Sequence, residues 1–221
     1  MSQHIVITGA NRGIGLELAR QWKDRGERVT ALCRTASDEL NELGVNVIEG
    51  IDITNDSDIA RARESLSGEP VDILYNNAGL LTDENLNDMN WDRIRTQFEI
   101  NTLAPLKVTL ALLDQIPKGG KVALMTSRMG SIADNDSGGR YGYRMTKAAL
   151  NAAGKSLAVD LKPRGIAVGI LHPGYVKTAM TGYTGHITPD VAAERLIQRV
   201  DELNLDNTGT FWHSDGSELP W

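Results

Sequence analysis

The chain has 221 residues, of which 41% are hydrophobic and 24% charged, a composition typical of a globular protein that can bury a core. Its formal net charge of −6 argues against a broad nucleic-acid surface and against binding to anionic membranes. It has one cysteine, no leader before the first apolar run and no apolar run near the ~20 residues that span a bilayer, so we expect a cytoplasmic protein with a single domain over residues 1–221.

Short apolar runs alternate with longer amphipathic stretches along the whole chain. In chain order they predict a strand at 5–7, a helix at 13–25, a strand at 29–33, a helix at 37–43, a strand at 45–49, a helix at 55–66, a strand at 71–75, a helix at 90–113, a strand at 121–126, a helix at 143–162, a strand at 166–171, a helix at 189–203 and a strand at 209–212. This alternation indicates the α/β class, with a doubly wound parallel sheet of about seven strands and helices on both faces. The irregular stretches 134–140 and 178–188 follow strands, at the edge where ligands bind such sheets.

A glycine-rich turn joins the first predicted strand to the first predicted helix, in the segment Thr8-Gly9-Ala10-Asn11-Arg12-Gly13-Ile14-Gly15. Gly9 permits a tight turn, and Gly13 and Gly15 let backbone and helix approach closely. The free N–H groups at the helix start then face a pyrophosphate. The turn predicts a dinucleotide site, although three glycines also occur in ordinary loops.

The end of the second strand indicates which dinucleotide is bound. An NAD site usually carries an acidic residue there, whereas this chain has Cys33 followed by Arg34. Arg34 and Arg12 are suited to a 2′-phosphate, so we predict NADP in preference to NAD. The alternatives are that Arg34 is a solvated surface residue and that Asp38 is the ribose ligand, but Asp38 fits better in the first turn of the next helix.

Two further polar segments follow strands. Asp52 comes after the third strand and can accept a hydrogen bond from an adenine amino group, or it can help start the next helix. The segment Asn76-Asn77-Ala78-Gly79 ends the fourth strand, where its small residues admit a cofactor and its amides can tie strands together.

Tyr143 and Lys147 are spaced i, i+4 on a predicted helix and so share a face. A nearby ammonium and an oxidised nicotinamide would both lower the pKa of the phenol from about 10. Tyr143 would then act as general acid in carbonyl reduction or general base in alcohol oxidation. Tyr141 lacks a lysine four residues on, since Met145 stands there.

Ser127 leaves the fifth strand at the same edge, where its hydroxyl can donate to a carbonyl oxygen. Ser131 and Thr126 are alternatives, and a plain turn serine is another. Pro105 lies in a predicted helix and has no N–H, so the Asn101 carbonyl loses its usual partner. That carbonyl becomes free to hold a water that passes protons between Lys147 and solvent; a kinked helix without chemistry is the alternative.

The four histidines have no ligand spacing and the cysteine is alone, so we expect no metal.

Taken together, the motifs resemble those of the short-chain dehydrogenase/reductase family from about residue 3 to the C-terminus, including Pro173-Gly174 after the sixth strand. The resemblance implies a Rossmann-like NAD(P)-binding domain and an oxidoreductase acting on C=O or CH–OH groups. It also implies a catalytic tetrad of Asn101, Ser127, Tyr143 and Lys147. The implied cofactor-binding residues are Gly9, Asn11, Arg12, Gly13, Ile14, Gly15, Arg34, Asp52, Ile53, Asn77, Ala78, Gly79, Tyr143, Lys147, Pro173, Gly174, Val176 and Thr178. Among these, Lys147 would bind the nicotinamide ribose, and Val176 and Thr178 the nicotinamide amide.

Within the family the chain is similar to the C-factor and carbonyl-reductase-like group, in the segments 126–151 and 216–221. This likeness keeps open a second hypothesis, a dinucleotide-binding signalling protein with little turnover. Ser127 and Tyr143 are 16 residues apart, somewhat more than is usual in the family, and the stretch after Thr178 is short, so we expect an extended 134–140 loop and a shallow or open pocket. Plausible apolar wall residues are Leu80, Leu81, Met129, Tyr175, Met180 and Tyr183. The resemblance also implies a homodimer or homotetramer through the two long helices, where Leu103, Leu106, Leu110 and Leu113 form a stripe that can instead face the sheet.

Overall fold

The computed structural model describes residues 2–221, which fold around one parallel sheet. Its strands are β1 (His4–Thr8), β2 (Arg28–Leu32), β3 (Asn46–Ile48), β4 (Ile73–Asn76), β5 (Lys121–Met125), β6 (Ala167–His172) and β7 (Phe211–His213). The order across the sheet is β3-β2-β1-β4-β5-β6-β7, and every neighbouring pair is parallel. The order reverses between β1 and β4, so chain crossovers diverge there and open a crevice at the carboxyl ends of these strands. The predicted doubly wound α/β sheet is confirmed.

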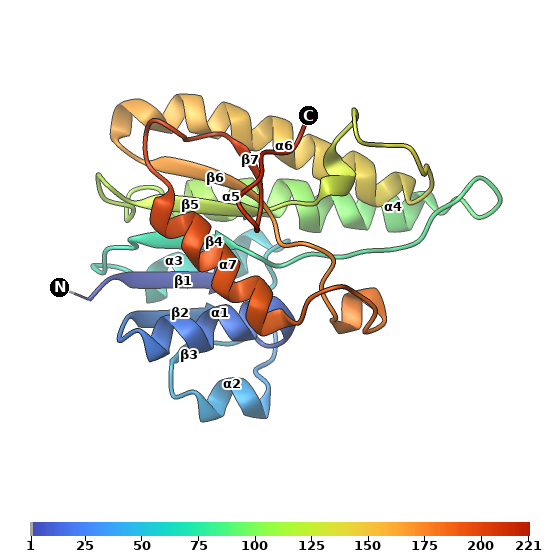
Figure 1. Cartoon of the computed structure of the whole chain (residues 1–221). Coiled ribbons are helices and arrows are strands. Elements are labelled where there is room, and N and C mark those ends of the chain that lie inside the picture. Colours follow the sequence, from blue (N-terminus) through green and yellow to red (C-terminus); the bar gives the residue numbers. More distant parts are fainter. Residues whose placement is uncertain (1) are drawn as a thin grey trace.

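Helices cover both faces of the sheet (Figure 1). On one face α1 (Gly13–Asp24) and α7 (Pro189–Glu202) pack together over side chains such as Ile5 and Ile7. On the other face α3 (Asp56–Ser65), α5 (Ala104–Leu112) and α6 (Tyr141–Leu161) pack over Val6 and its neighbours. Adjacent residues of β1 therefore point to opposite cores, which is why its run of apolar residues shows no alternation. The short helix α2 (Asp38–Glu42) adds Leu40 to the first core.

The segment predicted as one helix over 90–113 is divided into three parts. It comprises α4 (Trp91–Phe98), a π-helical turn at Glu99–Leu103 and α5 (Ala104–Leu112). In the middle part the Ala104 N–H donates to the Glu99 carbonyl, five residues back. Pro105 has no N–H for the next bond, so the widened turn replaces the simple kink that we weighed as an alternative.

The leucine stripe on this segment is divided between core and surface. Leu106 and Leu113 pack against the second core, whereas Leu103 and Leu110 are 40% and 61% exposed. The assembly through these helices stays a prediction. Within residues 2–221, none of the helices has the length and apolar character needed to cross a membrane.

Candidate active site

The glycines of the turn lie very close to neighbouring parts of the chain. Gly9 has φ +66°, and a Cβ placed on it would lie 2.9 Å from the Cα of Ala78. A Cβ on Gly15 would lie 2.4 Å from the Gly9 carbonyl oxygen, and one on Gly13 would lie 3.4 Å from Thr178 Cγ2. Side chains at these positions would fill the space above the start of α1. The turn therefore forms a cradle of bare backbone of the kind that receives a pyrophosphate.

Thr8 and Asn77 tie this cradle to the end of β4. The Thr8 hydroxyl oxygen lies 3.0 Å from the Asn77 N–H and 3.2 Å from the Ala78 N–H, both of which donate to it. The Asn77 amide donates back to the Thr8 carbonyl at 3.0 Å, and Asn76 donates to Thr109 of α5 at 3.0 Å. The Asn76 and Asn77 amides thus tie strand ends to neighbouring segments, which is one of the two roles predicted for this motif.

Two guanidinium groups remain available for a ligand, that of Arg12 in the glycine-rich turn and that of Arg34 after β2. Arg12 and Arg34 are exposed, and neither forms an ion pair within residues 2–221. Asp38 begins α2, where its charge favours the helix dipole, as expected.

Asp52 folds back on its own turn. One of its carboxylate oxygens accepts from the Thr54 N–H at 2.9 Å and from the Thr54 hydroxyl at 2.7 Å. These bonds lower the pKa of Asp52. The N-cap of α3 is Asn55, so Asp52 shapes the turn that precedes the helix while its second oxygen stays open to a ligand.

Lys147 and Tyr143 lie together at the start of α6. The Lys147 ammonium is buried, donates to the Met125 carbonyl at 2.7 Å, and lies 5.6 Å from the centre of the Tyr143 ring. Burial lowers the pKa of Lys147 to about 7. Burial also raises the pKa of Tyr143 to about 12, although Ser127 and the Arg140 charge act in the opposite direction. In the chain by itself the pKa of Tyr143 is thus raised, whereas the sequence analysis expected an oxidised nicotinamide to lower it.

Ser127 is available, whereas the two alternatives to it are already engaged. The Thr126 hydroxyl donates to Asn151 in the core, and the buried Ser131 hydroxyl accepts from the Asp134 N–H at 3.1 Å. Ser127 accepts a short-range bond from the Met129 N–H at 3.1 Å, and its hydroxyl acts on Tyr143, whose pKa it lowers. The turn that carries it presses on α6, since a Cβ on Gly130 would lie 2.7 Å from the main-chain carbon of Lys147. This contact fixes the distance between the strand end and the helix.

Asn101 lies in the π-helical turn and is fully buried. Its side chain bridges the backbone of Leu80, accepting from the N–H and donating to the carbonyl, both at 2.8 Å. It also donates to Thr146 at 3.2 Å. A Cβ on Gly79 would lie 3.3 Å from the Asn101 side-chain oxygen and 3.8 Å from the Lys147 ammonium, so these two groups flank the same short stretch of backbone.

The segment after β6 completes the ring around the cradle. Gly174 has φ +98°, which turns the chain away from the sheet. Val176 is buried and Thr178 faces Gly13, so both lie at the same edge as the glycine turn. The predicted cofactor residues thus follow β1, β2, β3, β4 and β6 or lie at the start of α6, and the fold gathers them at the carboxyl edge of the sheet.

Comparison with known proteins agrees with this arrangement. The sequence model described as short chain dehydrogenase matches residues 3–187. The chain belongs to this family. As a short chain dehydrogenase it is an oxidoreductase, and its glycine cradle fits the nicotinamide dinucleotides that the family uses.

Two characterised relatives are similar over much of this short chain dehydrogenase. The 1-hydroxy-2-glutathionyl-2-methyl-3-butene dehydrogenase of Rhodococcus sp. (strain AD45) is 40% identical over 223 residues, which cover 98% of this chain and 99% of the relative. The C-signal of Myxococcus xanthus is 42% identical over 155 residues, which cover 69% of this chain and 93% of the relative. The predicted resemblance to the C-factor group is thereby confirmed.

A solved structure is similar over the full length. The carbonyl reductase from Pseudomonas aeruginosa PAO1, in complex with NADP, superposes with a TM-score of 0.89 at 29% identity and covers all of both chains. The likeness to carbonyl reductases is therefore structural as well as sequence-based.

A pocket of about 260 Å³, the candidate substrate pocket, is lined by the segments after β4 and β6 and by Arg140. Of the apolar wall residues predicted from sequence, Leu81, Tyr175 and Met180 line it, whereas Leu80, Met129 and Tyr183 do not. The lining residues that sequence reasoning missed are Thr82, Asp83, Arg140, Thr181 and Thr184. The sequence carries no clear signal for Arg140, because this residue precedes the predicted helix over 143–162 and is the left-handed N-cap of α6 in the structure.

Proposed function

We propose that the chain is an NADP-dependent oxidoreductase that interconverts a carbonyl and an alcohol, with Tyr143 as the acid or base. The observation that carries this proposal is the position of Lys147, whose buried ammonium lies 5.6 Å from the centre of the Tyr143 ring and 3.8 Å from a Cβ placed on Gly79. The proton-handling group and the dinucleotide cradle therefore share one edge of the sheet.

Each catalytic side chain has a distinct role in this proposal. Because its pKa is raised to about 12, Tyr143 is protonated at neutral pH and can donate a proton to a carbonyl oxygen during reduction. Ser127 would donate a hydrogen bond to the same oxygen and stabilise the charge that develops on it. The bound coenzyme supplies or accepts the hydride.

Lys147 and Asn101 serve the proton and the coenzyme. Lys147 would hold the nicotinamide ribose and, as an ammonium, favour the Tyr143 phenolate needed in the oxidation direction. A water held by the main-chain carbonyl of Asn101 would then connect Lys147 to solvent. The side chain of Asn101 is committed to Leu80 and keeps this part of the site in shape.

The preference for NADP rests on Arg12 and Arg34. Both are exposed and without an ion-pair partner in the described residues, and no acidic residue replaces Arg34 at the end of β2. A 2′-phosphate is a suitable partner for two guanidinium groups. The NADP complex of the Pseudomonas carbonyl reductase supports the same choice.

The test is NADPH oxidation with a panel of aldehydes, ketones and quinones, comparing the wild type with Tyr143→Phe. We expect the variant to lose about 10²- to 10⁴-fold in kcat, the usual contribution of general acid–base catalysis. Its Kd for NADPH, measured by fluorescence, should change far less than kcat, because the glycine turn and Lys147, which would hold the rest of the coenzyme, stay intact. Equal turnover by both proteins would refute the role of Tyr143.

A second candidate function is a dinucleotide-binding signalling protein, favoured by the 42% identity to the C-signal of Myxococcus xanthus. It predicts tight NADPH binding with no turnover of any compound in the panel. The same experiment therefore separates the two functions.

A further inference from the structure

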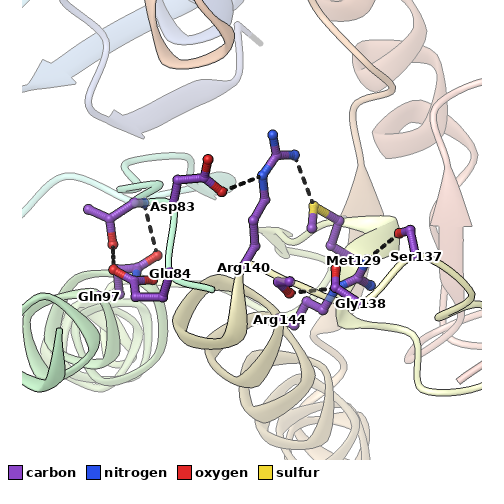
Figure 2. Close-up of polar contacts among 10 residues, drawn as sticks. Asp83, Glu84, Gln97, Met129, Ser137, Gly138, Arg140 and Arg144 are labelled. Carbon is purple, nitrogen blue, oxygen red and sulfur yellow. Dashed lines mark hydrogen bonds and ion pairs between the residues drawn. The ribbon is translucent and has the colours of Figure 1, made fainter. Parts of the chain in front are cut away.

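Two charged side chains, those of Asp83 and Arg140, form an ion pair in the lining of the candidate substrate pocket. Of the eight residues that line it, only Asp83 and Arg140 carry charge. The Arg140 Nε donates to an Asp83 carboxylate oxygen at 3.2 Å, and its Nη1 lies 4.0 Å from the Met129 sulfur (Figure 2). One weak sulfur contact and one carboxylate oxygen leave most of the five guanidinium donors free.

The backbone holds Arg140 in an unusual conformation. Arg140 has φ +49°, a left-handed conformation that residues with a side chain avoid, and it follows two glycines that are also left-handed. Arg144, one turn into α6, secures this conformation. Its guanidinium donates to the carbonyls of Gly138 and Gly139 at 3.2 Å and to the Ser137 hydroxyl at 2.8 Å, pointing away from Asp83 (Figure 2). Such over-determined strain is common at ligand clamps.

Asp83 is held in place from the other side. Its neighbour Glu84 is fully buried and accepts from the Gln97 amide at 3.0 Å and from the Thr82 hydroxyl (Figure 2). Thr82 is tied to Gln97 as well, through its N–H at 3.2 Å. The buried carboxylate of Glu84 is thus satisfied by Thr82 and by Gln97 of α4, and Asp83 is the acidic residue that pairs with Arg140.

The pocket adjoins the catalytic group through Met180. Met180 lines the pocket, and a Cβ on Gly79 would lie 3.9 Å from the end of its side chain and 3.8 Å from the Lys147 ammonium. The Arg140 charge also lowers the pKa of Tyr143, against the larger effect of burial. The Arg140 charge is therefore felt at Tyr143, beside which the reacting carbon would lie.

We propose that Arg140 determines substrate specificity by binding a carboxylate of the substrate, and that Asp83 occupies this guanidinium when the substrate is absent. The substrate class is a carbonyl compound or alcohol that carries a carboxylate a few bonds from the reacting carbon. This inference rests on the proposed function of Tyr143 and adds the substrate class to it.

The ion pair is suited to exchange. The side chains of Arg140 and Asp83 are 47% and 78% exposed, and such pairs contribute little to stability. A substrate carboxylate seated in the pocket is less exposed than Asp83 and can take two parallel hydrogen bonds from the planar guanidinium. The other lining residues are uncharged, so Arg140 is the one group of the lining that attracts an anion.

The test compares two aldehydes with their uncharged esters. Initial rates with NADPH are measured for 3- and 4-formylbenzoate and for their methyl esters, in the wild type, Arg140→Gln and Asp83→Asn. Arg95→Gln is the matched control, since Arg95 forms an exposed pair with Asp92 on α4, outside the pocket lining.

We expect Arg140→Gln to raise KM for at least one formylbenzoate by about 10- to 100-fold, the range for a hydrogen bond to a charged group, while KM for the ester changes less than twofold. Asp83→Asn should lower KM for the same acid several-fold, because it releases a donor and removes a repelling charge. Arg95→Gln should change neither value. The two halves of one ion pair thus have opposite effects.

A purely structural ion pair predicts a different result, in which both variants change acids and esters alike or change neither. That outcome overturns the proposal. Ester turnover that is lost in Tyr143→Phe reports on the proposed function separately. If no aldehyde is turned over, calorimetric binding of 3- and 4-(hydroxymethyl)benzoate to the NADP-loaded protein, compared with the methyl esters, decides the same question. Equal affinity of acids and esters, or no effect of Arg140→Gln, then refutes the role of Arg140.

Discussion

Replacing Lys147 by methionine should abolish activity and yet stabilise the fold. Burial lowers the pKa of this ammonium from 10.5 to about 7. At about 1.4 kcal/mol for each pH unit, protonated Lys147 destabilises the folded state by about 4 kcal/mol at pH 7. The variant loses the hydrogen bond to the Met125 carbonyl, which costs about 1–3 kcal/mol because the acceptor is buried. The net gain is about 2 kcal/mol, or about 4–8 °C in Tm for a chain of this length.

The pH dependence of the stability difference follows from the lowered pKa of Lys147 in the folded chain. Between pH 7 and 10.5 the unfolded chain binds a proton at Lys147 that the folded chain does not, so wild-type stability rises with pH across this window. The advantage of Lys147→Met should therefore be largest at pH 6–7 and vanish by about pH 9.5. Urea unfolding of both proteins without coenzyme, from pH 6 to 9.5, measures it. A variant that is less stable at pH 7, or a difference that does not shrink with rising pH, would refute the reasoning.

Two substitutions test the geometry around the site. Gly130→Ala places a methyl group 2.7 Å from the main-chain carbon of Lys147, so the turn carrying Ser127 must move off α6; we expect a loss of about 1–3 kcal/mol in unfolding and at least a tenfold lower kcat. An unchanged kcat would show that the turn and the helix are not coupled. Arg34→Asp should weaken NADPH binding at least tenfold in fluorescence titrations and leave NADH binding equal or tighter, since only the 2′-phosphate loses a partner and the ribose hydroxyls gain one. Parallel losses for both coenzymes would remove the basis of the NADP preference.

Much of the fold could be predicted because its signals are local. Each strand of the parallel sheet is a short apolar run, and α2 and α3 begin at residues whose side chains cap them, Ser37 and Asn55. The predicted helix over 90–113 shows the limit of such reasoning. Pro105 revealed that a backbone bond was missing, but the pattern did not determine whether the helix would bend or widen into a π turn.

The site divides in a similar way. Tyr143 and Lys147 were found from their spacing, because four residues on a helix place two side chains on one face whatever surrounds them. The spacing did not predict the direction in which their pKa values shift, because burial depends on which segments pack above them. Arg140 precedes the first residue of α6, and the spacing did not predict the left-handed backbone that directs its side chain towards Asp83.

The amino-acid sequence by itself determined the alternation of strands and helices, the glycine turn and the spacing of the proton-handling pair, since these depend on neighbours within one or two turns of the chain. The tertiary structure decided the widened helix around Asn101, the burial of Lys147 and the ion pair at the mouth of the pocket. Lys147 and Met125 are 22 residues apart and Arg140 and Asp83 are 57 apart, so only packing brings their atoms within the range of a hydrogen bond. The widened turn is local, but the Asn101 side chain inside it bonds to Leu80, which is 21 residues away.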